Sequence, residues 1–316
     1  MGNNELHVVI GTGAVGMSVI NDLNHRGKDI RAANRRGQAN VPDGVEIVQC
    51  DAANPDSTRQ VCKGATHVYN CVNAPDYHKW PEQFPPLHAG VLEGAAANDA
   101  RLIVMENLYM YGSHGGKPIT EEMTYNGQGP RSTTRIHMTK DLRAAHKSGK
   151  VRAVSARASD FFGPHVGDST VGERVFRAAL AGKSAQVLGN PDMLHTYTFI
   201  SDIGRALVIL GEHDEAFGQA WHIPSPPTLT TREFISEIFK IAGSKPKIST
   251  VPKFAIRPLA LFMPALKGID ELAHQFTEPF IMDHGKFEAA FGNHATPLEG
   301  AIRMTVQWYR ENPQIK

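Results

Sequence analysis

Cysteine is scarce in this 316-residue chain, and its three thiols show no spacing that would organise a site. Cys50, Cys62 and Cys71 are odd in number and include no Cys-x-x-Cys pair, which argues against a disulfide framework and a zinc site. The fifteen histidines are scattered and lack a His-Glu-x-x-His pattern, the usual helical zinc motif. We therefore expect free, buried thiols and no bound metal.

The sequence also lacks an excess of either charge and an apolar run of membrane-spanning length. With 33 basic and 32 acidic side chains the net charge is +1, so neither nucleic acid nor a membrane is expected as a partner. The most apolar late stretch, residues 254–266, contains Arg257 and two prolines and is shorter than the ~20 residues that cross a bilayer. The first residues lack the basic start and apolar core of a signal peptide. We expect a cytoplasmic protein whose partner is a small molecule.

Short apolar segments of strand length alternate with helical patterns through the first half of the chain. The segments are residues 6–10, 29–34, 45–50, 66–71, 101–106 and 151–157. This alternation predicts an α/β fold in which a doubly wound parallel sheet has helices on both faces. We expect a Rossmann domain over residues 1–163, rejoined by 196–226, and a smaller, mostly helical substrate lobe over 164–195 and 227–316. Ligands of such folds bind at the carboxyl ends of the strands.

The first predicted strand runs directly into the sequence GTGAVG, where a helix is expected to begin. Its glycines match G-x-G-x-x-G, a pattern that lets the backbone turn tightly and approach a pyrophosphate held by free amides at the helix N-terminus. We therefore predict a dinucleotide site that includes Gly11, Thr12, Gly13, Ala14, Val15 and Gly16.

The second predicted strand ends at Asn34, where an enzyme that prefers NAD usually has an acidic residue for the ribose 2′-hydroxyl. Here the sequence continues with Arg35 and Arg36. A guanidinium group can bind a 2′-phosphate through paired, charge-assisted hydrogen bonds. The sequence therefore favours NADP(H) over NAD(H), with these three residues around the adenosine, and two solvated surface arginines are the alternative.

Further motifs follow GTGAVG in a consistent order. They are NCVNA (70–74), ENLYMYG (106–112), RASDFFGP (157–164), FISDIGRAL (199–207) and the closing segment that starts with DHGKFEAAFG. Together they resemble the extended and atypical branches of the short-chain dehydrogenase/reductase superfamily, which include nucleotide-sugar epimerases. The extended branch usually has its first glycine one residue earlier, at the position of Ile10. The resemblance implies that Asp51 and Ala52 lie beside adenine and that Val72 and Asn73 line the cofactor.

The resemblance also implies a catalytic tyrosine and lysine four residues apart on one helix face, with a nearby serine or threonine. Lys140 matches the lysine, which lowers the pKa of the tyrosine and also orients the nicotinamide ribose. The tyrosine position holds Ile136, which cannot transfer a proton. Asn107 occupies the serine position and can donate a hydrogen bond to an oxyanion. Two of the three usual catalytic groups are therefore replaced.

Another acid is needed if the chain is an enzyme. Tyr109 is the first choice, because on an extended segment its side chain points the same way as that of Asn107. Dehydratases of the superfamily place a glutamate at this position. The alternatives are Tyr111, His137, Tyr125 and the absence of any proton donor.

The substrate site departs from the superfamily's pattern at the positions where epimerases hold a diphosphate. Asp160 repels a diphosphate, and His195 attracts it less than the usual arginine does, which argues against a nucleotide sugar. Leu108 and Tyr109 likewise replace the Asp-Glu pair of dehydratases. We expect an otherwise apolar substrate site that is lined by Tyr111, Asp160, Phe161 and His195.

These observations favour an NADP(H)-dependent oxidoreductase of the atypical type that acts on a small or lipophilic carbonyl-like substrate. A non-catalytic NADP(H)-binding redox sensor and a nucleotide-sugar epimerase with a rebuilt site are the alternatives. Dimerisation through two helices is common in the superfamily, so we also allow for a homodimer.

Overall fold

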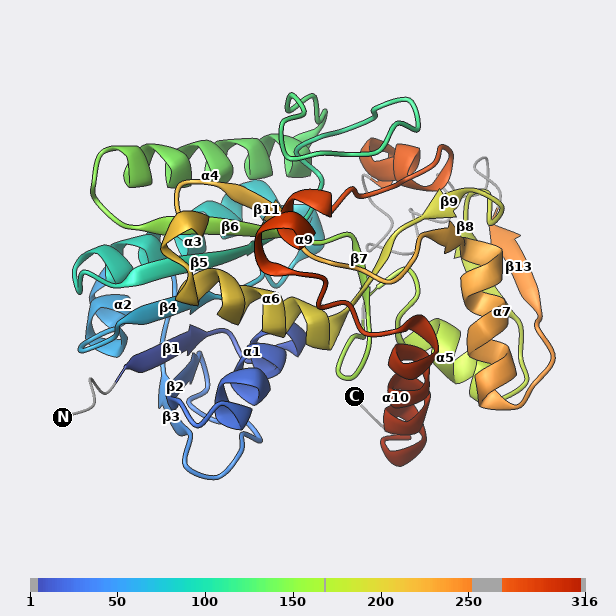
Figure 1. Ribbon diagram of the computed structural model, residues 1–316, viewed down its shortest axis with the longest axis horizontal. Coiled ribbons are helices and arrows are strands. Elements are labelled where there is room, and N and C mark those ends of the chain that lie inside the picture. Colours follow the sequence, from blue (N-terminus) through green and yellow to red (C-terminus); the bar gives the residue numbers. More distant parts are fainter. Residues whose placement is uncertain (1–4, 168, 252–268, 314–316) are drawn as a thin grey trace.

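The main sheet of the protein has seven parallel strands. The computed structural model describes residues 5–167, 169–251 and 269–313 (Figure 1). The strand order is β11-β6-β5-β4-β1-β2-β3. The strands are β1 (Leu6–Ile10), β2 (Asp29–Asn34), β3 (Glu46–Gln49), β4 (His67–Asn70), β5 (Arg101–Glu106), β6 (Ala153–Arg157) and β11 (Ala220–His222). This confirms the predicted α/β fold with a doubly wound parallel sheet.

Helices cover both faces of this sheet, as predicted (Figure 1). One face carries α1 (Ala14–His25) and α6 (Ile200–Glu212), and the other carries α2 (Pro55–Val61), α3 (Trp80–Ala96) and α4 (Pro130–Lys147). Every residue of β4 and β6 is buried as a result. Polar side chains on these strands are therefore buried too and need partners inside the protein.

The segment that contains α6 returns to the sheet from far along the chain. Ser18 of α1 donates a hydrogen bond to the carbonyl of Ile200, at 2.7 Å. Gly204 faces Ser18 so closely that a Cβ atom there would lie 2.2 Å from the serine hydroxyl. The absent side chain lets α1 and α6 pack tightly. β11 then adds an edge strand beside β6.

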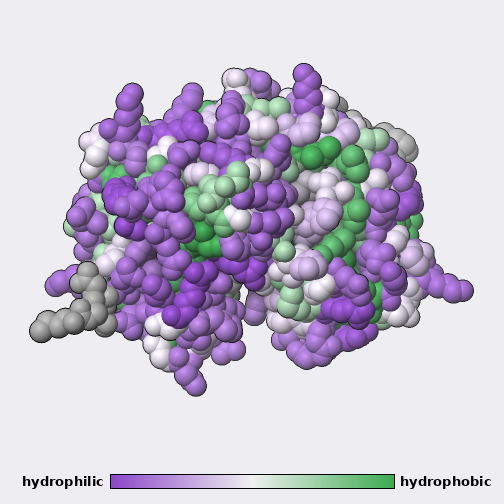
Figure 2. Space-filling view, viewed as in Figure 1, coloured by the Kyte–Doolittle hydropathy of each residue, from purple (hydrophilic) through white to green (hydrophobic). Residues whose placement is uncertain are grey.

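The other half of the molecule is built from smaller elements (Figure 1). Three two-stranded sheets pair β7 (Asp160–Phe162) with β10 (Tyr197–Phe199), β8 (Ala185–Leu188) with β13 (Ile248–Val251), and β9 (Leu194–His195) with β12 (Leu229–Thr230). The longer helices there are α5 (Glu173–Leu180), α7 (Thr231–Ala242) and α10 (Leu298–Glu311), while α9 (Gly285–Phe291) packs beside β11. The surface is indented between the two halves on the face drawn in Figure 2.

The described parts of the chain contain no disulfide bond and no group of side chains that could hold a metal ion. Cys50 and Cys62 are buried and Cys71 is half-buried, each as a free thiol. No group of three His, Cys, Asp or Glu side chains within those parts could hold a metal ion. No helix within them combines the length and the apolarity needed to cross a bilayer. The apolar stretch 254–266 lies outside the described residues.

Two histidines stack on each other inside the sheet. His7 of β1 and His67 of β4 are 0% and 3% exposed, and their ring centroids lie 4.5 Å apart. His7 Nδ1 is 3.2 Å from the Tyr69 hydroxyl, and His67 Nε2 is 3.1 Å from the carbonyl of Gly211. Burial lowers the pKa of His7 to about 3 and that of His67 to about 4. Both rings are therefore neutral in the folded protein at neutral pH.

This stack makes the folded state sensitive to acid. In the unfolded chain a histidine titrates near pH 6.5, so the stability that the neutral rings provide is complete above that pH and is lost as the pH falls toward 4. We expect His67→Gln to reduce the loss of unfolding free energy between pH 6.5 and 5 by up to about 1.4 kcal/mol per pH unit. Urea unfolding at several pH values measures this slope, with His25→Gln on the exposed side of α1 as the control. If the slope is unchanged in His67→Gln, the buried histidine is not the cause of the loss of stability in acid.

Candidate functional site

The glycine loop after β1 is shaped to receive an anion. Gly11 has a φ of +99°, and a Cβ atom at Gly16 would lie 1.8 Å from the carbonyl oxygen of Gly11. Gly13 faces open space, since nothing lies within 4 Å of the place where its Cβ would be. No side chain caps α1 at this end, and its first turn contains no acidic residue. The free amides of the first turn, around Thr12, Gly13, Ala14 and Val15, therefore fit a pyrophosphate.

The turn after β2 lies next to this loop. Asn34 donates a hydrogen bond to the Thr12 hydroxyl at 2.7 Å, and its Oδ1 accepts from the amides of Arg36 and Gly37 at 2.9 and 2.8 Å. Asn34 thus holds the turn to the loop. Arg35 and Arg36 are both exposed, and within the described residues neither side chain forms an ion pair. Their guanidinium groups are free to meet an anion next to the dinucleotide loop.

The residues that follow β3 and β4 complete the same edge of the sheet. Asp51 is exposed and accepts a hydrogen bond from the amide of Ala53 at 3.0 Å. Ala52 is buried, with its carbonyl against Gly90 of α3. Val72 is half-buried and Asn73 is exposed. The structure therefore brings the predicted adenine and cofactor residues to the carboxyl ends of adjacent strands, where such folds bind ligands.

Two tyrosine hydroxyls meet beyond the ends of β4 and β5. The Tyr77 hydroxyl donates a hydrogen bond to the Tyr109 hydroxyl at 2.7 Å, and the Tyr109 ring stacks on Trp80 with centroids 5.7 Å apart. Burial raises the pKa of Tyr109 well above its usual value and raises that of Tyr77 to about 12. Both hydroxyls therefore keep their protons at neutral pH, and burial makes each a weaker acid than an exposed tyrosine.

Tyr77 is positioned by a second group of contacts. Arg131 of α4 donates from Nε to the Tyr77 carbonyl at 3.0 Å, and its guanidinium lies 4.2 Å from the centre of the Tyr77 ring. Arg131 also pairs with Glu271 at 3.1 Å. No sequence pattern pointed to Tyr77, because it belongs to a short 3₁₀ turn, Tyr77–Lys79, with no periodic pattern. The available signal was the aromatic pair Tyr77 and Trp80 just after a strand that ends at the ligand-binding edge.

The segment from Asn107 to Tyr111 is not extended, although an extended geometry was the reason for choosing Tyr109. Asn107 Oδ1 accepts a hydrogen bond from the amide of Tyr109 at 3.2 Å, and the amide of Tyr111 bonds to the carbonyl of Leu108 at 3.1 Å. These two bonds close a turn, so neighbouring side chains separate into different clusters. Tyr109 packs with Trp80, whereas Leu108 packs with Ile136. Asn107 is half-buried beside Tyr109 and keeps its Nδ2 protons for another acceptor.

Tyr111 does not line an open substrate site, contrary to the prediction. It is 2% exposed, and its hydroxyl is bonded to Arg157 at 2.6 Å and to His222 Nε2 at 2.9 Å. Its hydroxyl is therefore fully engaged inside the protein. Tyr125 is also held by Arg157, at 2.7 Å. His137 is exposed on α4. None of these three alternative acids lies in the cluster of Tyr77 and Tyr109.

The superfamily's tyrosine position on α4 is directed away from the tyrosine pair. Ile136 is half-buried and packs against the apolar cluster around Leu108 and Met110, while Lys140 is exposed. Other residues of α4 face the tyrosine pair, among them Arg135, whose guanidinium lies 5.1 Å from the centre of the Trp80 ring. Ile136 therefore fills a packing position rather than vacating a catalytic one.

The two positions that differ from the diphosphate pattern contact each other. Asp160 Oδ2 lies 3.0 Å from His195 Nε2, although the ring is not aligned for a hydrogen bond, and Asp160 also accepts a bond from Thr170 at 2.9 Å. His195 is 3% exposed and stacks on Tyr197, with ring centroids 4.5 Å apart. Phe161 is half-buried next to them. The Asp160 carboxylate would repel a diphosphate, as predicted. The His195 ring is largely enclosed by the protein.

A buried ion pair supports the whole of this region. Arg157 at the end of β6 donates to Glu106 at the end of β5 at 2.9 Å, and the two side chains are 0% and 1% exposed. Thr139 of α4 donates to the other oxygen of Glu106 at 2.7 Å. Burial alone would raise the pKa of Glu106, but Arg157 and Thr139 outweigh it and hold that pKa below its usual value. The sequence analysis missed this network.

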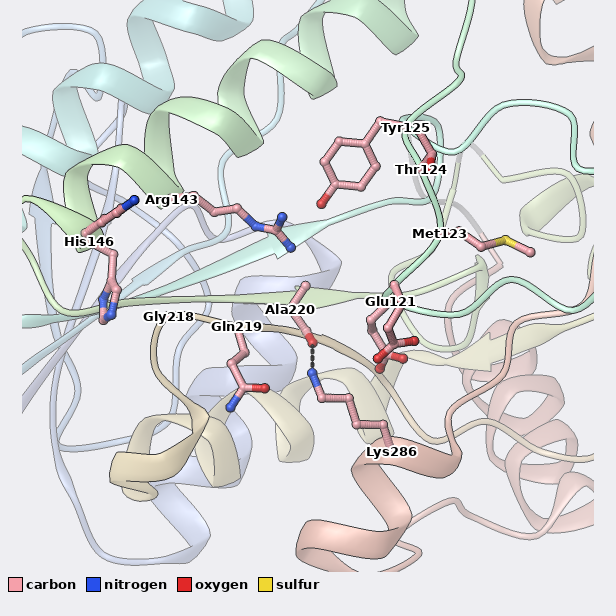
Figure 3. Close-up of a pocket in the computed structure, with 12 residues that line it drawn as sticks. Glu121, Met123, Thr124, Tyr125, Arg143, His146, Gly218, Gln219, Ala220 and Lys286 are labelled. Carbon is pink, nitrogen blue, oxygen red and sulfur yellow. Dashed lines mark hydrogen bonds between the residues drawn. The ribbon is translucent and has the colours of Figure 1, made fainter.

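A separate groove, with a volume of about 880 Å³, runs beside the edge strand β11 (Figure 3). Lys286 of α9 donates to the carbonyl of Ala220 at 2.9 Å, and Glu121 accepts from the amide of His222 at 2.7 Å. These side chains satisfy backbone groups that an unpaired edge strand would otherwise expose. Tyr125 lines this groove, whereas Asn107 and Tyr109 do not. The groove is thus distinct from the tyrosine pair.

Known proteins resemble this chain in sequence and in fold. A model described as the NAD dependent epimerase/dehydratase family matches residues 8–223. A curated Arabidopsis thaliana protein, 3beta-hydroxysteroid-dehydrogenase/decarboxylase isoform 2, is 27% identical in an alignment of 159 residues. The match covers 47% of this chain and only 28% of that protein.

Solved structures share the fold over almost the whole chain. An epimerase from Methanothermobacter thermautotrophicus has a TM-score of 0.80 at 16% identity and covers 98% of this chain and 93% of its own. UDP-glucose 4-epimerase from Thermus thermophilus, in complex with NAD, has a TM-score of 0.77 at 19% identity and covers 96% and 99%. dTDP-glucose 4,6-dehydratase from Bacillus anthracis, also with NAD, scores 0.78 at 16% identity and covers 98% and 97%. At these identities the likeness shows the fold alone.

The buried ion pair predicts a large mutational effect. Arg157→Met leaves the Glu106 carboxylate buried without its partner, so we expect the free energy of unfolding to fall by about 3–5 kcal/mol. Urea unfolding at pH 7.5 measures the loss. The matched control is Arg232→Met, which removes an exposed arginine that pairs with Asp192 at 2.6 Å and should leave the midpoint unchanged. An equal loss of unfolding free energy in the two variants would show that the buried ion pair contributes no more to stability than the exposed one.

Proposed function

The chain belongs to the NAD dependent epimerase/dehydratase family, and from that premise we propose that it is an NADP(H)-dependent oxidoreductase acting on a small or lipophilic carbonyl compound. The observation that carries the proposal is the pair of protonated hydroxyls on Tyr77 and Tyr109, 2.7 Å apart at the carboxyl edge of the sheet. A protonated tyrosine in this place can replace the acid that Ile136 cannot supply.

The dinucleotide would be held by the loop from Gly11 to Gly16 and would supply a hydride when bound. The preference for a 2′-phosphate is assigned to Arg35 and Arg36, which follow the turn that Asn34 ties to Thr12. Two exposed guanidinium groups without ion pairs among the described residues can meet a phosphate without giving up another partner. Lys140, exposed on α4, is assigned the contact with the nicotinamide ribose.

The chain's own groups would act on the carbonyl oxygen. Asn107 polarises that oxygen through Nδ2, since its Oδ1 already accepts from the amide of Tyr109. Tyr109 donates the proton to the carbonyl oxygen, which leaves a negative charge on the Tyr109 phenolate oxygen. The hydrogen bond from Tyr77 stabilises that phenolate. Trp80 and Phe84 supply apolar walls that keep water from the reacting atoms.

A non-catalytic NADP(H) sensor is the second candidate. It is favoured by one observation: Ile136 is packed into an apolar cluster, so the usual position of the superfamily's proton donor holds no acid. An epimerase acting on a nucleotide sugar is less well supported, because the half-buried carboxylate of Asp160 stands 3.0 Å from His195 where a diphosphate would need positive charge.

The cofactor preference is tested with the arginines after β2. The double variant Arg35→Ala, Arg36→Ala removes charge-assisted hydrogen bonds to a 2′-phosphate, so we expect NADPH to bind about a hundredfold more weakly and NADH to be affected less than about threefold. Calorimetric titration of both cofactors measures the change. Arg59→Ala on α2, which pairs with Glu93 instead, is the control. Equal weakening of NADPH and NADH would show that these arginines do not read the 2′-phosphate.

The acid is tested by removing a single hydroxyl. Tyr109→Phe should lower kcat for NADPH oxidation with carbonyl compounds by about a hundredfold or more and leave NADPH affinity unchanged. Tyr309→Phe, which loses a buried hydroxyl bonded to the carbonyl of Val166, is the matched control. Unchanged turnover in Tyr109→Phe would remove the assigned acid. Tight NADPH binding without turnover of any carbonyl compound by the unaltered protein would favour the sensor.

A further inference from the structure

Arg135 is a buried cation that forms no direct ion pair or hydrogen bond with a carboxylate of the described residues. Its side chain is 6% exposed, and its Nε atom is fully enclosed with no hydrogen-bond partner. The face of the guanidinium is covered by the ring of Phe84, at 4.2 Å from the centroid, and by that of Trp80, at 5.1 Å. No carboxylate in the described parts of the chain forms an ion pair with it. Aromatic faces offset only part of the cost of burying a charge.

The neighbouring carboxylates are already committed to other cations. Glu106 bonds to Arg157 and Thr139, and Glu271 bonds to Arg131. The interior at this point therefore holds one more guanidinium than carboxylate. Burial lowers the pKa of Arg135 to about 10, which still leaves it charged at neutral pH. Glu106 attracts the charge of Arg135, but it pairs directly with Arg157 and not with Arg135. Arg135 therefore makes no direct bond to a carboxylate of the described residues, and its guanidinium is suited to bind an anion of a ligand.

The position of Arg135 ties it to the tyrosine pair. Trp80 contacts both groups, because the Arg135 guanidinium lies over its ring and the Tyr109 ring stacks on it at 5.7 Å. The anions of a bound dinucleotide are met elsewhere, at the loop from Gly11 to Gly16 and at the turn after β2. A ligand anion at Arg135 therefore belongs to the substrate.

We propose that Arg135 binds a carboxylate of the substrate, so that the substrate is a carbonyl compound that carries a carboxylate on an apolar body. This inference rests on the proposed function and narrows its substrate class. The fork of a guanidinium matches the two oxygens of a carboxylate, and such a pair is strongest where water is excluded. The apolar walls of Trp80 and Phe84 suit the rest of the molecule.

Benzoate and its uncharged isostere benzamide probe the site without any need for turnover. Their binding to the full chain is measured by calorimetry and by the change in tryptophan fluorescence, with no cofactor present. We expect benzoate to bind the unaltered protein at least about tenfold more tightly than benzamide, and Arg135→Met to abolish that preference. Arg135→Lys keeps the charge but not the fork, so it should retain part of the preference. Arg143→Met, an exposed arginine on the same helix, is the matched control.

Stability separates a binding role from a structural one. Methionine fills a similar volume without a charge, so Arg135→Met should unfold at the same temperature as the unaltered protein or at a higher one. A lower unfolding temperature together with unchanged benzoate affinity would show that the arginine serves packing, and would overturn the proposal. So would equal affinities of the unaltered protein for benzoate and benzamide. These titrations need no NADPH, so they give a result even if the protein is not an oxidoreductase. A failure of the carboxylate proposal can therefore be told apart from a failure of the proposed function.

Discussion

The ion pair between Glu106 and Arg157 is the interaction on which the architecture of the site depends. It joins the ends of β5 and β6, and each partner also binds a group from a more distant segment: Thr139 of α4 for the glutamate, Tyr111 for the arginine. Since all of these groups are buried, every one of their bonds must form together. The pair therefore fixes where α4 and the turn after β5 stand relative to the sheet.

Under the proposed function, that constraint explains how the acid can come from another element without a change of fold. With α4 anchored through Thr139, Arg135 lies near the tyrosine pair, and Ile136 is directed into an apolar cluster. The turn after β5 then presents Tyr109 instead, where the hydroxyl of Tyr77 meets it. In this arrangement a tyrosine and a cation still lie near each other, as in the superfamily's usual pair, but they come from different elements. The fold is shared with nucleotide-sugar enzymes, while the groups around the reacting atoms are this chain's own.

The buried polar residues of the sheet follow from its layered construction. Because helices cover both faces, strands such as β4 and β6 bury every residue, including His67 and Arg157. Each is accommodated differently: the histidine stays neutral against His7, and the arginine stays charged against a carboxylate. Arg135 of α4 is buried and charged as well, but no carboxylate of the described residues pairs with it directly, although Glu106 attracts its charge. Under our proposal a carboxylate of the substrate is its direct partner.

The sequence alone determined the parallel sheet, the glycine loop and the family. These depend on local features, namely the alternation of strand and helix patterns and the steric need for glycine where Gly16 approaches the Gly11 carbonyl. Only the tertiary structure decided which side chains meet: Tyr77 with Tyr109, Asp160 with His195, and Arg135 with no carboxylate in the described parts of the chain. Tertiary contacts also decided that Tyr111, which was predicted to line the substrate site, is buried in the protein. Its direction is set by a turn closed by Asn107 and Leu108 and by an arginine on another strand, and such long-range contacts leave no periodic trace in a single sequence.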